Sequence, residues 1–181
     1  MKIETKRLII RPFKSSDYER VATVCNDYDV AKTTLAIPHP YTEDNAKDFI
    51  NYTLEATKAK QSYEYAICFK EDPSFVIGCV GLMNINYNAK KAELGYWIDK
   101  SHWGKGVATE ASIAMIRFAF DYLKLHSVIA RHAVHNPASG KVMKKCGMTY
   151  VGLFREHEYR DGKFYDVDYY EILASDLNIK K

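Results

Sequence analysis

A predicted strand, a glycine-containing turn and a predicted helix follow one another between residues 91 and 123, and this succession constrains the fold more than any other part of the chain. Ala92 to Ile98 is rich in Leu, Tyr, Trp and Ile, which indicates a strand. The turn consists of Trp103, Gly104, Lys105, Gly106, Val107 and Ala108. From Thr109 onward, apolar residues recur at offsets of three and four, which predicts an amphipathic helix. The apolar face of this helix consists of Ala111, Ala114, Met115, Phe118 and Tyr122.

The strand, the turn and the helix together predict a binding site for an anion. Glycine lets the backbone approach a ligand closely, and the first N–H groups of a helix have no partners within the helix. The helix dipole adds roughly half a positive charge at the same point. We therefore expect this turn to hold a pyrophosphate. The expected contact residues are Gly104, Lys105, Gly106, Val107, Ala108 and Thr109.

Two common phosphate-binding motifs do not fit this turn. A Walker A loop has the pattern Gly-x-x-x-x-Gly-Lys-Ser/Thr, whereas a single residue separates the two glycines here. The dinucleotide fingerprint Gly-x-Gly-x-x-Gly requires a third glycine at the position of Thr109. The turn therefore matches neither motif, and a nucleotide-binding regulatory domain that uses the same turn for another phosphate ligand stays an alternative.

At this junction the sequence resembles the GNAT superfamily of N-acetyltransferases. The family signature is Arg/Gln-x-x-Gly-x-Gly/Ala, and the matching residues are Trp103, Gly106 and Ala108, so the first position departs from the pattern. The longer run GYWIDKSHWGKGVATEA is similar to the Rim-type branch, which acetylates the N-termini of ribosomal proteins. The resemblance implies an enzyme that binds acetyl-CoA and transfers the acetyl group directly from the thioester to a primary amine.

Length, charge and cysteine content limit the other possibilities. The chain has 181 residues, which fits one domain over residues 1–181 with a full core. The formal net charge of +3 is spread along the chain, so nucleic acid is not expected as a partner. No apolar run has the length of a signal peptide or a membrane span. The four cysteines have no paired spacing, which favours free thiols in a reducing cytoplasm.

The rest of the sequence predicts strands and helices in an α/β (α+β) arrangement. Strands are predicted at residues 5–13, 63–69, 76–85, 92–98, 127–134, 149–159 and 163–173. Helices are predicted at residues 16–26, 42–60 and 136–147 and from residue 109. Residues 27–41 are expected to be a loop or a short helix, and the GNAT resemblance makes this segment a wall of the acceptor site.

Local signals mark several boundaries of these elements. Ser16 and Glu19 have the spacing of a capping box, and Thr42 has the position of an N-cap. Gly78 and Gly81 indicate a bulge or close packing within a strand. Asp161-Gly162 is typical of a type I′ hairpin turn.

The connections predict a mixed, mostly antiparallel central sheet of about seven strands with helices on both faces. Short turns join the second, third and fourth strands, which favours antiparallel pairing. The helix from Thr109 is long enough for a crossover, so strand 127–134 should run parallel to strand 92–98. The GNAT resemblance implies that these two strands, the fourth and fifth, splay apart. It also implies that the pantetheine arm bonds to the edge of the fourth strand, near Trp97 and Ile98.

Two polar residues follow the fifth strand. Asn136 before Pro137 is a good N-cap with proline at the first helical position, and this role needs no ligand. The resemblance adds a contact between Asn136 and the cofactor. Ser139 lies in the first turn of the same helix, where a serine is common. The matching serine of the Rim-type enzymes can protonate the departing sulfur, so the resemblance implies that Ser139 is the general acid.

Two carboxylates are candidates for the base. The resemblance favours Glu158, just before the last hairpin turn, whose alternative role is a solvated charge. Glu93 lies on the central strand, on the same face as Gly95 and Trp97, and the sequence leaves open whether this face is the cleft. Family geometry suggests that a backbone N–H near Leu94 or Gly95 donates a hydrogen bond to the oxyanion that forms during acetyl transfer.

Other chemistry is disfavoured by the sequence. His132 and His135 are three residues apart on a strand and point to opposite faces, so no metal site is expected. Cys146 fits a buried core thiol better than a nucleophile. The expected acceptor is a protein N-terminus resembling those of ribosomal proteins. The alternatives are a polyamine, an amino sugar or an amino acid as acceptor, a non-catalytic CoA-binding module, and an ordinary turn without a ligand. A homodimer is also considered.

Overall fold

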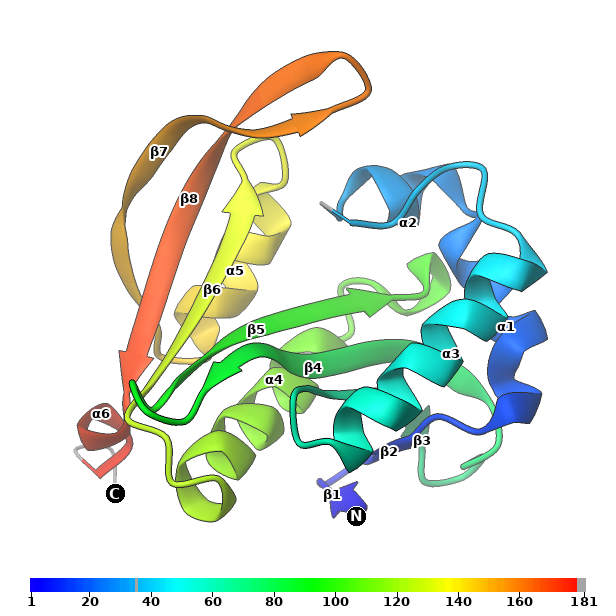
Figure 1. The fold of residues 1–181 in the computed structure, drawn as a ribbon, viewed down its shortest axis with the longest axis horizontal. Coiled ribbons are helices and arrows are strands. Elements are labelled where there is room, and N and C mark those ends of the chain that lie inside the picture. The colour runs from blue at the N-terminus through cyan, green and yellow to red at the C-terminus, as the bar shows by residue number, and fades with distance from the viewer. Residues whose placement is uncertain (35, 179–181) are drawn as a thin grey trace.

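The computed structural model describes residues 1–34 and 36–178 and places them around one sheet of eight strands (Figure 1). The strands are β1 (Ile3–Glu4), β2 (Leu8–Pro12), β3 (Tyr63–Phe69), β4 (Val76–Asn86), β5 (Lys91–Ile98), β6 (Ser127–Ala133), β7 (Thr149–Arg160) and β8 (Lys163–Leu173). The α-helices are α1 (Tyr18–Cys25), α2 (Tyr28–Lys32), α3 (Glu43–Lys58), α4 (Val107–Arg117), α5 (Pro137–Lys145) and α6 (Ala174–Asn178). The strand order is β1-β2-β3-β4-β5-β6-β8-β7.

The predicted fold class is confirmed, with one correction to the strand count. All neighbouring strands are antiparallel except β5 and β6, which are parallel, as the crossover predicted. The predicted first strand, residues 5–13, is confirmed over Leu8–Pro12, but its start was wrong because the chain turns back on itself there. The N–H of Thr5 donates to the carbonyl of Leu8 (3.0 Å), and the turn places Ile3 opposite Ile10. This extra hairpin gives eight strands within the described residues.

Helices cover both faces of the sheet, as Figure 1 shows for α1 and α3 on one face and α4 on the other. The alternation of β3 divides its side chains between the two layers. Tyr65 and Ile67 belong to the core under α4, whereas Ala66 and Cys68 belong to the core under α1 and α3. The acceptor side of the molecule, described below, lies in the α1 and α3 layer.

Helix α4 begins at Val107, two residues before the predicted start at Thr109, and its apolar face was predicted only in part. Ala111 and Met115 are fully buried, whereas Tyr122 is 61% exposed and was wrongly assigned to this face. The reason is a π-helical turn at Phe118–Tyr122. A π turn has more residues than an α turn, so it rotates the following side chains away from the expected face.

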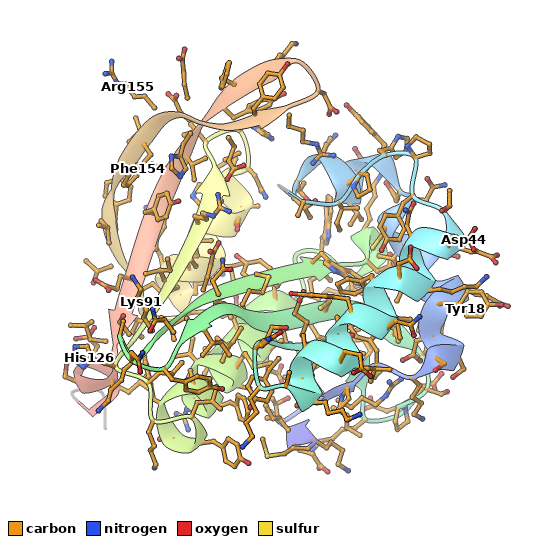
Figure 2. All side chains as sticks on the ribbon, in the orientation of Figure 1. Tyr18, Asp44, Lys91, His126, Phe154 and Arg155 are labelled. Carbon is orange, nitrogen blue, oxygen red and sulfur yellow. The ribbon has the colours of Figure 1, made fainter. Side chains whose placement is uncertain are left out.

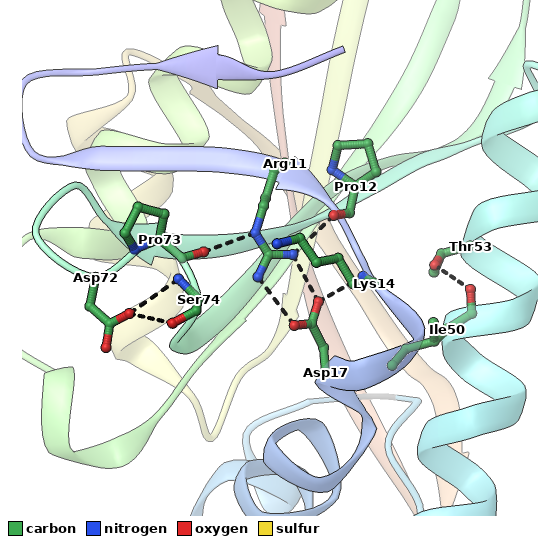
Figure 3. Close-up of polar contacts among 9 residues, drawn as sticks. All are labelled: Arg11, Pro12, Lys14, Asp17, Ile50, Thr53, Asp72, Pro73 and Ser74. Atoms are coloured by element: carbon green, nitrogen blue, oxygen red, sulfur yellow. Dashed lines mark hydrogen bonds and ion pairs between the residues drawn. The ribbon is translucent and has the colours of Figure 1, made fainter.

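A buried ion pair holds α1 against the sheet (Figure 3). Arg11 Nη1 donates to Asp17 Oδ2 (2.8 Å), and the side chains are only 9% and 5% exposed. Arg11 Nε also donates to the carbonyl of Pro73 in the turn between β3 and β4 (3.0 Å). The capping box predicted at Ser16 was wrong, because a 3-10 turn over residues 15–17 precedes α1 and the Asp17 carboxylate accepts the N–H of Lys14 (2.7 Å).

Several local predictions are confirmed. Thr42 caps α3 by accepting the N–H of Asn45. Asp161 and Gly162 both have positive φ angles (50° and 77°), as a type I′ turn requires. Gly78 is closely packed, because a Cβ there would lie 2.5 Å from the Trp97 carbonyl oxygen. The register of β3 and β4 also shifts beside it.

Strands β5 and β6 begin together and then separate. Their paired positions run from Lys91 opposite Ser127 to Leu94 opposite Ala130, and no pair follows among the described residues. Figure 2 shows Lys91 and His126 close together where the two strands start, and Figure 1 shows the strands diverging from there. The edge of β5 from Gly95 onward is therefore open toward β6, which is the splay that the resemblance implied.

All four cysteines are buried free thiols, and Cys146 lies in the main core as predicted. Among the described residues, no helix has the length and apolar character needed to cross a membrane.

Candidate active site

A cavity of about 300 Å³ lies between the open edge of β5, the glycine turn and α5. We call it the cofactor cavity. Most of the residues predicted to bind a cofactor line this cavity. They are Trp97, Ile98, Gly104, Gly106, Val107, Ala108, Thr109, Asn136 and Ser139. Lys105 is the one predicted contact residue that is not part of this lining. Residues from three separate segments of the sequence are thus brought to one cavity.

The glycine turn presents main-chain donors to this cavity. Gly104 and Gly106 have φ angles of 72° and 76°, the left-handed region that glycine adopts without a steric cost. Gly106 is the N-cap of α4, and within the described residues no side chain caps the start of the helix. The carbonyl of Lys105 accepts a hydrogen bond from Arg7 Nη1 (3.0 Å), which turns it toward the N-terminal hairpin. Trp103, where the family pattern has Arg or Gln, donates from Nε1 to the Ile98 carbonyl (2.8 Å) and braces the turn.

Helix α5 forms the opposite wall of the cofactor cavity. Asn136 is its N-cap, as predicted, since its Oδ1 accepts the N–H of Ser139 (3.4 Å). Its Nδ2 donates to the carbonyl of Thr33 (2.9 Å), which ties α5 to the segment after α2. Lys141 and Lys145, one turn apart, also line the cavity and were missed by the sequence analysis. The uncapped helix and these two ammonium groups fit a polyphosphate ligand.

A second cavity of about 470 Å³ lies on the face of the sheet under α1, α3 and the segment between them. We call it the acceptor cavity. Glu93, Gly95 and Trp97 line it, which answers the question that alternation left open: this face of β5 is the cleft. The two cavities meet, because four residues line both of them: Thr33, Tyr96, Trp97 and Ser139.

Tyr96 and Ser139 form a hydrogen-bonded pair at this junction. The Tyr96 hydroxyl lies 2.8 Å from Ser139 Oγ and 3.2 Å from the Ser139 carbonyl oxygen. Burial raises the pKa of Tyr96, so its hydroxyl keeps its proton at neutral pH. Ser139 was predicted, whereas Tyr96 was missed because a tyrosine in a strand gives no sign of which face or partner it has.

The two predicted bases, Glu93 and Glu158, converge on one arginine that the sequence analysis missed. Arg131 Nε donates to Glu93 Oε1 (2.8 Å), and Arg131 Nη1 pairs with Glu158 Oε1. Asn84 donates to the other oxygen of Glu93 (2.9 Å) from a bulge in β4, where its φ is 51°. Glu93 and Arg131 line the acceptor cavity, and Glu158 stands behind Arg131 on β7.

The β7–β8 hairpin closes the same side of the molecule through Arg160. Its guanidinium donates to the carbonyls of Ala31 and Ile37 (both 2.8 Å) and also contacts the carbonyl of Thr34. Thr34 and Ile37 line the acceptor cavity. The segment 27–41, predicted as a wall of the acceptor site, is thus held in place by the hairpin.

Metal ligands do not gather in this region. Within residues 1–34 and 36–178, no group of three His, Cys, Asp or Glu side chains is placed to hold a metal ion. His132 is buried with Nδ1 on the carbonyl of Ala133 (2.9 Å), and His135 is exposed, so the two do not form a pair of ligands.

Comparison with known proteins gives one matching family and several full-length relatives. The acetyltransferase (GNAT) domain matches residues 7–149. An uncharacterized N-acetyltransferase of Bacillus subtilis, YnaD, is 31% identical over 98% of this chain and 100% of its own length. The ribosomal-protein-serine acetyltransferase of Escherichia coli is 32% identical over 56% of each chain.

A solved structure supports the fold. The crystal structure of spermidine N-acetyltransferase from Vibrio cholerae, in complex with CoA and spermine, superimposes with a TM-score of 0.82 at 24% identity. The match covers 95% of this chain and 98% of that one.

Proposed function

The chain belongs to the GNAT family of acetyl-CoA-dependent N-acetyltransferases, and on that premise we propose that its acceptor is the amine of a protein N-terminus. One observation carries the transfer to an amine: the cofactor cavity and the acceptor cavity share Tyr96, Trp97 and Ser139, so an acetyl thioester and an amine can meet there. The ribosomal-protein-serine acetyltransferase among the relatives supports a protein N-terminus as the acceptor.

The residues present fit acetyl-CoA. The uncapped N-terminus of α4 with Lys141 and Lys145 would hold the phosphates, and the open edge of β5 from Gly95 to Ile98 would bond the amides of the pantetheine arm. When bound, acetyl-CoA supplies the activated acetyl group. The chain's own residues then orient the amine, stabilise negative charge and deliver a proton.

We propose that Ser139 delivers this proton from its Oγ and that the Tyr96 hydroxyl replaces it through their 2.8 Å contact. The backbone N–H near Leu94 or Gly95 is the proposed donor to the developing oxyanion, since these residues line the acceptor cavity beside the junction. Because Arg131 bridges Glu93 and Glu158, we propose that these three residues act as one unit that orients the acceptor. The assignment of either carboxylate as the base stays a prediction.

A second candidate function is acetylation of a small polyamine. It is favoured by the carboxylates of Glu64 and Glu93 in the acceptor cavity and by the spermidine N-acetyltransferase among the structural neighbours. Amino sugars, amino acids and a non-catalytic CoA-binding role remain alternatives. A cytoplasmic location and a homodimer stay predictions from the sequence.

The deciding experiment measures release of CoA thiol from acetyl-CoA with matched acceptors. We expect turnover with a peptide that carries a free N-terminus, none with the same peptide N-terminally blocked, and a lower kcat/KM with spermidine. A higher kcat/KM for spermidine would identify a polyamine enzyme instead. Binding of CoA by calorimetry without thiol release for any amine would identify a non-catalytic module.

A further inference from the structure

Glu64 is a carboxylate in the acceptor cavity that the predicted mechanism does not use. It lies on β3 and lines the cavity, and its side chain is half-buried. No hydrogen bond or ion pair to this carboxylate is made by the part of the chain that the structure describes. Glu93 and Glu158 differ from it, because both already accept hydrogen bonds from Arg131. Glu64 therefore has its full hydrogen-bonding capacity free for a ligand in the cavity.

The register of the sheet places Glu64 in line with Gly95 near the junction of the two cavities, and the methyl group of Met83 lies against Gly95 on this line. In the register of the strands, Glu64 lies opposite Gly81 on β4, and Gly81 lies opposite Gly95 on β5. A Cβ at Gly81 would be 2.6 Å from Glu64 Cγ, so only glycine leaves room for this side chain to lie across the sheet. Two strand spacings of roughly 4.8 Å separate Glu64 from Gly95. An acceptor amine, directly or with one water, spans that distance.

The thiol and phenol groups that line the cavity with Glu64 are neutral at physiological pH. Cys79 on β4, Cys25 on α1 and Tyr41 before α3 line the same end of the cavity, and burial raises the pKa of each, that of Cys25 to about 12. Asn45 from α3 is uncharged, and across the cavity the charge of Glu93 is paired with Arg131.

Because no cation compensates it, burial raises the pKa of Glu64 to about 7. A base whose pKa lies near the working pH can take a proton and release it again. An amine that enters the cavity as an ammonium could therefore pair with the Glu64 carboxylate, which has no other partner among the described residues.

We propose that Glu64 is the catalytic base of this enzyme: its carboxylate receives the acceptor as an ammonium and takes one proton from it. This proposal rests on the acetyltransferase activity proposed above. The neutral amine then forms the new C–N bond as the C–S bond breaks. Ser139 protonates the departing thiolate and takes a proton from Tyr96, and the second proton of the amine nitrogen passes to Tyr96, so the pair ends in its starting state. The proton on Glu64 leaves to solvent, so one amide, one thiol and one proton are produced per turnover.

The test compares Glu64→Gln with the matched variants Glu93→Gln and Glu158→Gln in the thiol-release assay, from pH 5.5 to 9. We expect kcat/KM of the natural enzyme to rise with pH through an acidic limb near pH 7. Glu64→Gln should replace this limb with one at the pKa of the free amine, about 8 for an α-amine, and lower kcat/KM at pH 7 roughly 10²- to 10⁴-fold, the usual contribution of a general base. Glu64→Asp should restore the limb at a reduced rate. The other two variants should keep the limb.

Two measurements separate the possible failures. CoA affinity by calorimetry and the circular dichroism spectrum should be unchanged in Glu64→Gln, which excludes a merely structural defect. If Glu64→Gln keeps the limb and stays within about threefold of the natural rate, or if the limb disappears in Glu158→Gln instead, Glu64 is not the base. If the unmodified protein binds CoA but releases no thiol with any amine, the proposed acetyltransferase function has failed. That outcome is distinct from a failure of the Glu64 assignment, in which the unmodified protein does release thiol.

Discussion

The two cavities are built in different ways, and the difference explains which of them the sequence could reveal. The cofactor cavity depends mainly on main-chain groups: a glycine turn, the uncapped start of α4 and the open edge of β5. The acceptor cavity is made largely of side chains from α1, α3, α5, the segment before α3 and four adjacent strands, β3, β4, β5 and β6. A site made of main-chain groups requires particular glycines at particular spacings, whereas a site made of side chains requires only that distant residues meet.

The cavities also differ in charge. The cofactor cavity has the positive end of α4 with Lys141 and Lys145, and the acceptor cavity has the carboxylates of Glu64 and Glu93. An anionic cofactor and a cationic amine are therefore attracted to different sides of one junction. The variants that follow perturb the acceptor side, the junction and the cofactor cavity in turn, in order of decreasing free-energy change.

The largest effect is expected where the acceptor wall is fastened to the sheet. Arg11→Met leaves the Asp17 carboxylate buried without its cationic partner, and breaking such a pair costs about 3–5 kcal/mol of unfolding free energy. Urea unfolding measures this loss. The matched control is Lys47→Met, whose exposed pair with Asp44 should contribute less than about 1 kcal/mol. Equal losses in both variants would show that the buried pair does not hold the wall.

Stability should also depend on pH through Glu64. Its pKa of about 7 in the folded protein lies above its ordinary value of 4.5, so the folded state binds this proton more tightly. The free energy of unfolding should fall as pH rises from 4.5 to 7, by roughly 3 kcal/mol at most. Glu64→Gln should remove this fall, so the variant should be more stable than the natural protein at pH 8. A natural protein whose unfolding free energy is flat over this range would contradict the assignment.

The junction should show coupled losses of turnover. Ser139→Ala and Tyr96→Phe are each expected to lower kcat by about tenfold to a hundredfold, since each interrupts the same proton path. The kcat of the double variant should be only slightly below that of the less active single variant, because the effects of substitutions within one hydrogen-bond network are not additive. Stopped-flow measurement of thiol release tests this, and fully additive losses of kcat would show that the two residues act independently.

In the cofactor cavity, Gly106→Val places a β-branched residue at a φ of 76°. The left-handed conformation costs roughly 1–2 kcal/mol for a residue with a Cβ, so CoA should bind about tenfold more weakly. Gly152→Val is the control, since space is open around that position and its φ is not positive. Calorimetry measures the affinity of each variant for CoA. Equal affinities would show that the turn does not bind CoA.

The smallest effect is expected at the exposed lysines of the same cavity. Lys141→Ala and Lys145→Ala should each weaken CoA binding by a few-fold, about 0.5–1 kcal/mol, and high salt should reduce the difference. Lys144→Ala, on the same helix but outside the cavity lining, should bind CoA normally. A similar loss in all three variants would indicate a general effect of net charge.

The sequence by itself determined the elements whose cause is local. The bounds of β3 and β8 agree with their predictions, because dense apolar patterns and turn residues mark both strands. The glycine turn was found for the same reason, since a left-handed turn needs glycine, whereas Ser139 was found through the resemblance to the Rim-type enzymes. The π-helical turn that exposes Tyr122 and the hairpin before β2 were missed, because neither interrupts the apolar pattern.

Only the tertiary structure decided which polar side chains face one another. Glu64, Tyr96 and Arg131 occupy ordinary positions in strands, and each acquires a role through a residue 17 to 43 positions away in the sequence or through burial. Alternation along a strand fixes that neighbouring side chains face opposite sides, but not which side is covered. Burial and partners depend on how the strands are ordered in the sheet and which helices cover it, and those are properties of the whole chain.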